Sequence, residues 1–173
     1  MVDGGSSRPR AYARAPTMEP SSTTSTAPVR RRLGGCRAGI ADGDTVESMV
    51  ATVEAAASVA DFVIVTVHWG VELDTNPRPE DVERAGALIA AGADAIFGHH
   101  PHRLQPLEVV QGRPVFWSLG NFVWPEMSAA SARTGVARVV ISPDGEVSSC
   151  LIPAVIESSG HPVVTGDAPC EAP

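Results

Sequence analysis

Hydrophobic and polar positions divide the chain into an N-terminal stretch without periodicity and a patterned remainder. From about residue 42, apolar residues recur three and four positions apart, which is the spacing of one buried helix face. We expect this first helix to begin at a cap formed by Asp42 or Asp44, with Glu47 as the capping-box partner. The same periodicity predicts that it ends near Ala60.

Short apolar runs follow this helix and a second one. The run at 61–68 is mostly β-branched, and another run covers 93–97. Such runs are typical of strands in a sheet that is covered on both faces. Between them, apolar spacing predicts a helix over 79–91, with Pro79 near its start and Gly92 as its stop. Helices and strands that alternate in this way predict an α/β fold.

The rest of the patterned region reads as two β-hairpins. One covers 107–118 with a turn at 111–113, and the other covers 135–156 with a turn at 143–145. The domain organisation that we expect is therefore a disordered, low-complexity segment over 1–39, a folded domain over 40–157, and a flexible tail rich in Pro and Gly over 158–173.

Charge and composition narrow the classes of function. The 173 residues carry a formal net charge of −7, and this charge is divided unevenly. Seven arginines face two acidic residues in 1–39, whereas six arginines face eighteen acidic residues after that point. The acidic remainder argues against nucleic-acid binding. Lysine is absent, which excludes a Schiff-base or P-loop lysine.

The sequence also bears on compartment and on cysteine chemistry. There is no run of 18 apolar residues and no recognisable secretory signal, so we expect no membrane span in this chain. The cysteines at 36, 150 and 170 are widely spaced and form no CxxC pattern. We therefore expect free thiols rather than a disulfide framework or a zinc knuckle.

Histidines gather where two successive predicted strands end. His68 closes the first strand, and His99, His100 and His102 follow the second. Ligands of open α/β sheets bind beyond the carboxyl ends of the strands, and imidazole is a frequent ligand of transition-metal ions. Because side chains alternate along extended backbone, His100 and His102 are expected on one side of their segment. The alternative is a set of hydrogen-bonded loop histidines, and the constellation favours a metal site.

Three further side chains are candidates for the chemistry of this site. Glu72 and Glu108 lie close in sequence to the histidine segments, and each could be a ligand, a general acid or a surface charge. Asn121 follows a predicted strand and a glycine, where it could ligate a metal, orient a phosphate or bind its own turn. We take Glu72 and Asn121 as the candidate catalytic residues.

Four stretches together resemble the capsule-synthesis CapA family, also known as poly-γ-glutamate biosynthesis proteins, within the calcineurin-like metallophosphoesterase superfamily. They are Asp61-Phe-Val-Ile-Val-Thr-Val-His-Trp-Gly-Val-Glu72, Gly92-Ala-Asp-Ala-Ile-Phe-Gly-His-His-Pro-His102, Gln105-Pro-Leu-Glu108 and Ser118-Leu-Gly-Asn-Phe-Val123. The resemblance implies a four-layer α/β/β/α sandwich with a two-metal centre between its sheets. His68 would match one histidine ligand of the superfamily, His100 and His102 would match its final ligand pair, and His99 could share a role.

The resemblance also implies a function and its cofactors. It implies metal-dependent phosphoester hydrolysis in capsule or poly-γ-glutamate biosynthesis, with Mn, Zn or Fe as the divalent metal ion and up to two ions in a complete domain. Partners would be the polymer or its synthesis machinery, at the membrane or outside it. The family's earlier motifs, which supply Asp and Asn ligands, do not occur here. We therefore expect the C-terminal half of a domain, either part of an enzyme, a non-catalytic accessory protein or an inactive fragment.

Half of a sandwich has a structural consequence. It would leave one apolar sheet face and one strand edge without partners. We therefore expect the isolated chain to be marginally stable or to associate.

Overall fold

The computed structural model describes residues 41, 43–125, 128–143 and 145–171. The disorder expected for 1–39 and the free thiol expected at Cys36 lie outside these residues. The elements are, in chain order, α1 (Val46–Ala57), β1 (Ile64–His68), α2 (Pro79–Ala90), β2 (Ala95–His99), β3 (Leu107–Val110), β4 (Arg113–Phe116), α3 (Ala129–Ala132), β5 (Arg133–Ile141), β6 (Val147–Ile156) and β7 (Pro162–Val164).

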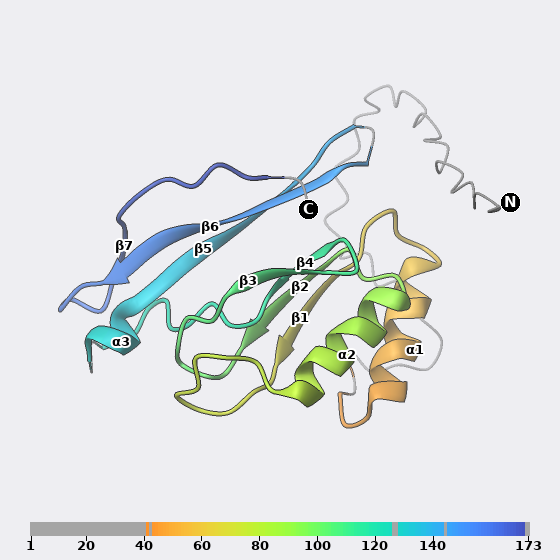
Figure 1. Ribbon diagram of the computed structural model, residues 1–173, viewed down its shortest axis with the longest axis horizontal. Coiled ribbons are helices and arrows are strands. Elements are labelled where there is room, and N and C mark those ends of the chain that lie inside the picture. The colour runs from red at the N-terminus through yellow and green to blue at the C-terminus, as the bar shows by residue number, and fades with distance from the viewer. Residues whose placement is uncertain (1–40, 42, 126–127, 144, 172–173) are drawn as a thin grey trace, which may run out of the picture. The chain divides into compact units, whose positions relative to one another are not determined.

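Four strands form the sheet that carries the predicted strand ends. Its order is β1-β2-β4-β3, with β1, β2 and β4 parallel and β3 antiparallel to β4. The helices α1 and α2 lie side by side on one face of this sheet (Figure 1). The predicted α/β class is thus confirmed at the level of a mixed α/β fold.

A second, antiparallel sheet has the order β5-β6-β7. It approaches the first sheet where β6 contacts β4, on the side away from the helices (Figure 1). The described residues therefore form three layers, helix, sheet and sheet. The fourth layer of an α/β/β/α sandwich is not seen among them.

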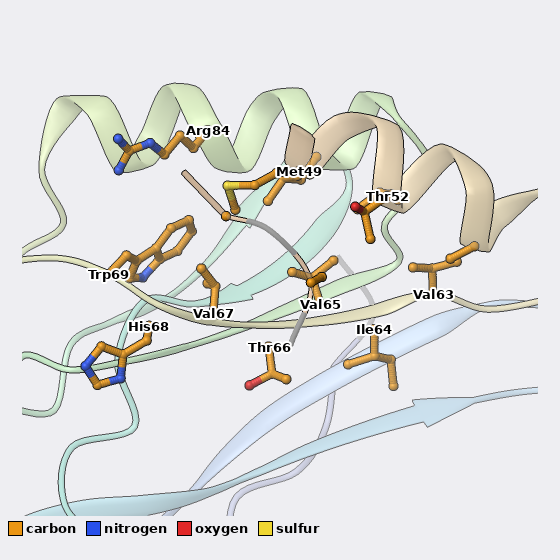
Figure 2. Close-up of a pocket in the computed structure, with 15 residues that line it drawn as sticks. Met49, Thr52, Val63, Ile64, Val65, Thr66, Val67, His68, Trp69 and Arg84 are labelled. Carbon is orange, nitrogen blue, oxygen red and sulfur yellow. The ribbon is translucent and has the colours of Figure 1, made fainter. Parts of the chain in front are cut away.

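The two faces of β1 have different environments (Figure 2). Val63, Val65, Val67 and Trp69 point toward the helices, where the core contains fully buried side chains such as Leu88. Ile64, Thr66 and His68 point the other way, and 50% of Ile64 is exposed. The prediction that β1 is covered on both faces is therefore wrong, because the second sheet meets the first at β4.

The start of α1 also differs from the prediction. Thr45 is the N-cap, and its side chain accepts a hydrogen bond from the backbone N–H of Ser48 at 3.1 Å. The hydroxyl of Ser48 in turn accepts from the N–H of Thr45, which completes a capping box. Asp44 and Glu47 do not form this box, because the first helical turn begins one residue later than the acidic cap required.

The start of α2 is held by a buried carboxylate. Asp81 is 1% exposed and accepts hydrogen bonds from Arg78 Nε and Nη2 at 2.8 Å and from Arg84 Nη1 at 3.1 Å. The hydrogen bonds that Arg78 itself donates to Asp81 raise the pKa of Arg78. Because both guanidinium groups remain about one-third exposed, the charges are only partly removed from water.

The predicted hairpins form, and the tail adds structure that the sequence analysis did not anticipate. A third strand, β7, pairs with β6. Further on, Glu171 pairs with Ser149, and this places Cys170 beside Cys150 in a disulfide. The expectation of free thiols at these two cysteines is wrong, because the chain returns along β6 and brings together residues that are 20 positions apart.

Candidate functional site

The parallel pairing of β1 with β2 brings the predicted histidines together. His68 lies opposite His99 in the register, so their side chains leave the same face of the sheet. The chain then turns, and the ring of His100 lies beside that of His68 with centroids 4.6 Å apart. The His100 and His102 centroids are 6.2 Å apart. The carboxyl ends of two neighbouring strands thus carry one histidine cluster, His68, His99, His100 and His102.

The backbone of this cluster is not extended, as the sequence analysis assumed. His100 has φ 105° and His102 has φ 54°, both in the left-handed region that residues with a side chain rarely adopt. The predicted reason for their proximity, alternation along an extended segment, is therefore wrong. Backbone strain of this kind costs about 1–3 kcal/mol per residue and is found mainly at functional sites.

Asn121 fixes the orientation of one imidazole. It is 5% exposed, and its Oδ1 lies 2.6 Å from Nδ1 of His102. Its Nδ2 donates to the backbone oxygen of Ser131, which identifies Oδ1 as the acceptor toward His102. The Nδ1 of His102 therefore carries a proton, so in the neutral ring Nε2 is the nitrogen that has the lone pair. The geometry therefore supports a role for Asn121 in orienting the imidazole of His102.

Backbone contacts hold the loops that carry the cluster. Trp69 donates its N–H to the carbonyl of His99 at 3.0 Å, and Leu73 donates to Pro101 at 2.7 Å. Beneath them, the indole of Trp69 donates to the carbonyl of Trp117 at 3.0 Å. The loop after β1 is therefore fastened both to the loop after β2 and to the core.

A buried amide that the sequence analysis gave no role fastens this loop from below. Gln105 is 4% exposed, and its Nε2 donates to the backbone oxygens of Asp74 and Asn76, each at 3.0 Å. No periodicity marks such a residue, because its partners lie about 30 positions earlier in the chain. Gln105 is therefore a positioning residue that sequence pattern alone did not reveal.

The two glutamate candidates have different surroundings. Glu108 accepts a hydrogen bond from the indole of the fully buried Trp117 at 2.7 Å, which is a structural contact on β3. Glu72 is exposed, and within the described part of the chain it makes no hydrogen bond or ion pair. Neither glutamate makes a hydrogen bond or an ion pair with a histidine of the cluster.

Partial burial affects the protonation of the cluster. Burial lowers the pKa of His99, and the charge of His68 lowers it further. Both effects favour the neutral imidazole, which is the form that binds a metal ion.

The ring separations show how far the cluster resembles a set of metal ligands. Two imidazoles on one tetrahedral zinc ion would have ring centroids about 5 Å apart. The His68–His100 separation of 4.6 Å is close to this distance, whereas the His100–His102 separation of 6.2 Å exceeds it. In residues 41–171 as far as they are described, however, no three His, Cys, Asp or Glu side chains are arranged to hold an ion together. The described residues thus bring imidazoles close together but do not by themselves form a complete set of metal ligands.

Exposed apolar side chains on the loops next to the histidine cluster form what we call the apolar rim. The ring of Trp124 lies 5.2 Å from that of His102 and is 41% exposed. Leu73, Phe122 and Val123 are each more than half exposed. Exposed apolar side chains that gather beside polar residues are typical of a binding surface.

The fold is a mixed α/β sheet with histidines at two consecutive strand ends, which is the edge where ligands of open α/β sheets bind. The model of the family described as bacterial capsule synthesis protein PGA_cap matches residues 4–126. The chain belongs to this family, so the resemblance inferred from its motifs is confirmed.

Relatives share these stretches. The chain is 45% identical over 80 residues to the PGA biosynthesis protein CapA of Bacillus subtilis, which covers 46% of this chain and 21% of the relative. It is 36% identical over 106 residues to the capsule biosynthesis protein CapA of Bacillus anthracis, covering 61% and 26%. A probable polyglutamine synthesis accessory protein of Mycobacterium tuberculosis is 35% identical over 83 residues, covering 48% and 22%. The chain thus matches about a quarter or less of each of these relatives.

No helix in the described part of the chain has the length and apolar character needed to cross a membrane.

Proposed function

We propose that this chain acts in the synthesis of a capsule or poly-γ-glutamate polymer, as part of a CapA-like protein whose histidine cluster binds a divalent metal ion. The observation that carries the metal proposal is the convergence of His68 and His100 from neighbouring strand ends, with centroids 4.6 Å apart. Membership of the PGA_cap family supports the role in polymer synthesis.

In this proposal the described residues have distinct tasks. His68, His100 and His102 would hold the ion, and His99 would stand beside them as a neutral imidazole. Asn121 keeps the proton of His102 on Nδ1, so that Nε2 is available as a donor atom. The bound ion would supply Lewis-acid activation for hydrolysis of a phosphoester. Glu72, which is exposed and makes no hydrogen bond or ion pair within the described residues, is a candidate proton donor for that reaction.

A non-catalytic role is the second candidate, and one observation favours it. No carboxylate converges on the histidines in the described residues, so the charge of an ion there would be balanced poorly. The Mycobacterium tuberculosis relative is itself named an accessory protein. In this reading the cluster binds one ion for structure, and the apolar rim around Trp124 contacts the polymer or its synthesis machinery.

Metal content tests the site directly. The purified chain is loaded with zinc or manganese, dialysed and measured by elemental analysis, beside a His100→Ala/His102→Ala variant. His161 lies in an exposed turn outside the cluster, so His161→Ala is the matched control. We expect about one ion per chain, retained in the control and lost in the double variant. Equal metal content in all three proteins would refute the site.

Hydrolysis of a chromogenic phosphodiester by the loaded chain separates the two candidates. Turnover that disappears in the double variant supports the enzyme. A metal-loaded chain without turnover supports the accessory role.

A further inference from the structure

The arginines after residue 39 differ in whether they have a charged partner. Lysine is absent, so arginine supplies every permanently cationic side chain of this part. Three of these arginines form ion pairs with carboxylates: Arg78, Arg84 and Arg113. Two more are exposed on β5: Arg133 and Arg138. Arg103 is the one that is only partly exposed and yet has no ion pair with a carboxylate of the described residues.

The guanidinium of Arg103 lies beside the histidine cluster. Its Nη1 donates a hydrogen bond to the backbone carbonyl of His102 at 2.8 Å. A guanidinium has five N–H donors, and within the described residues this bond is the one that Arg103 donates from its side chain. The other donors can therefore bind a ligand. A charge that is partly removed from water without an opposite charge is unfavourable, and a bound anion would compensate it.

The backbone of Arg103 is held by the segment that follows β4. Leu104 pairs with Leu119 in an antiparallel bridge. Gly120 comes next, with φ 69°, and a Cβ on it would lie 3.2 Å from the backbone nitrogen of Leu104 and 3.6 Å from the carbonyl carbon of Arg103. Arg103 thus starts from a fixed place next to His102, as is required of a residue that selects a ligand.

Charge indicates which kind of ligand fits. The residues after 39 include eighteen acidic side chains and six arginines, so this part of the chain repels anions in general and an anion needs a local cation. A guanidinium and a divalent metal ion repel each other unless an anion lies between them. The planar fork of arginine matches two oxygens of a carboxylate or a phosphate group. An oxyanion satisfies all of these conditions.

We propose that Arg103 binds an oxyanion of the ligand, a phosphate or a carboxylate group, beside the histidine cluster. Trp124, whose ring lies 5.2 Å from that of His102 and is 41% exposed, offers an apolar surface for the part of the ligand that carries this group. The proposal rests on the proposed function for the place of the ligand, and it deepens that function by naming a residue that selects the ligand by its charge.

Calorimetric titration with inorganic phosphate and, separately, with acetate tests the proposal, each with and without zinc. Arg103→Gln removes the charge and keeps a polar side chain, whereas Arg103→Lys keeps the charge without the fork. Arg138→Gln is the matched control, because it makes the same change of charge at an exposed position of β5. The anion that binds the wild type more tightly identifies the source as a phosphoester or a carboxylate.

We expect the wild type and Arg138→Gln to bind this anion equally. Arg103→Gln is expected to bind it about tenfold or more weakly, and Arg103→Lys to have an intermediate affinity. Equal affinity in the wild type and Arg103→Gln, or no measurable binding of either anion to the wild type, would overturn the proposal. An equal loss in Arg138→Gln would overturn it too, because general charge would then explain the binding.

Zinc affinity separates anion binding from a purely structural role. If Arg103 only held His102 through its carbonyl, Arg103→Gln would weaken zinc and anion binding together, and this result would overturn the proposal. We expect the zinc affinity of Arg103→Gln to equal that of the wild type. Circular dichroism of each variant checks that the fold is retained.

The metal site and the anion site can fail separately. A wild type that binds no zinc but binds the anion through Arg103 would refute the metal site and support this inference. A wild type that binds zinc, with an anion affinity that does not depend on Arg103, would refute this inference and leave the metal site in place.

Discussion

The helix-covered face of the first sheet and the carboxyl edge of that sheet use the same strands but differ in how they are built. On the covered face, Leu88, Val115 and Trp117 are completely buried, and they lie on ordinary helical or extended backbone. At the edge, His100 and His102 have left-handed backbone and partly exposed rings. The covered face is thus packed for stability, whereas the edge carries left-handed backbone of the kind that is frequent at binding sites.

Gly98 lies where the two regions meet, and replacing it is expected to have the largest effect. A Cβ at this position would collide with the carbonyl of Trp117 and the indole of Trp69. Gly98→Val is therefore expected to lower the free energy of unfolding by about 3 kcal/mol or more. Urea denaturation followed by circular dichroism measures this. Gly43→Ala, whose Cβ meets nothing within 4 Å, is the control, and equal denaturation midpoints would contradict the close packing.

Replacing Asp81 tests how much its ion pairs contribute to the stability of the helix-covered face. Asp81→Ala removes the acceptor of two guanidinium groups, and we expect a loss of about 2 kcal/mol in the free energy of unfolding. The loss is moderate because Arg78 and Arg84 are about one-third exposed and water can solvate them. Thermal unfolding measures it, with the exposed Glu83→Ala as control. A variant as stable as the wild type would show that the ion pairs contribute nothing.

Replacing Asn121 tests whether the orientation of His102 matters for metal binding at the carboxyl edge of the sheet. Asn121→Ala removes the hydrogen bond to Nδ1, and we expect zinc affinity to fall about 10- to 100-fold with only about 1 kcal/mol of stability lost. Calorimetric titration with zinc measures the affinity. Asn76→Ala, an exposed residue of the neighbouring loop, is the control. If zinc affinity is unchanged in Asn121→Ala, the amide does not position the ring.

His100 provides the smallest effect, because two variants that both lose the imidazole are expected to differ only through the backbone conformation at this position. Glycine adopts φ 105° without strain, whereas alanine does not. His100→Gly should therefore be more stable than His100→Ala by about 1 kcal/mol, although both lose the imidazole. Thermal unfolding of the two variants measures the difference. Equal stability would show that the backbone at the edge is not strained.

Local patterns were sufficient to predict the main elements of the first sheet. Periodicity placed α1 and α2, and short apolar runs placed β1 and β2, because each signal depends on neighbouring residues. The prediction that both faces of β1 are covered was wrong, because the coverage of the second face depends on where the distant strand β6 meets the sheet. The bond between Cys150 and Cys170 was missed for a similar reason. It requires the tail to return along β6, and no local pattern encodes that return.

The candidate site was predictable to a similar extent. Histidines at consecutive strand ends were enough to predict a cluster, because parallel strands share one carboxyl edge. The left-handed conformation of His100 and His102 and the contact between His102 and Asn121 were not predictable. Both follow from packing between loops that are separated in sequence. The metal ion itself stays a prediction.

The disulfide between Cys150 and Cys170 has a practical consequence for the covalent state of the molecule. Such bonds persist in oxidising compartments and are kept reduced by glutathione and thioredoxin elsewhere. Material produced in a reducing host compartment will carry thiols at Cys150 and Cys170, whereas oxidised material will carry the bond between them. The two preparations will differ in how the last residues are attached to β6, so the compartment chosen for expression decides which chemical form is assayed.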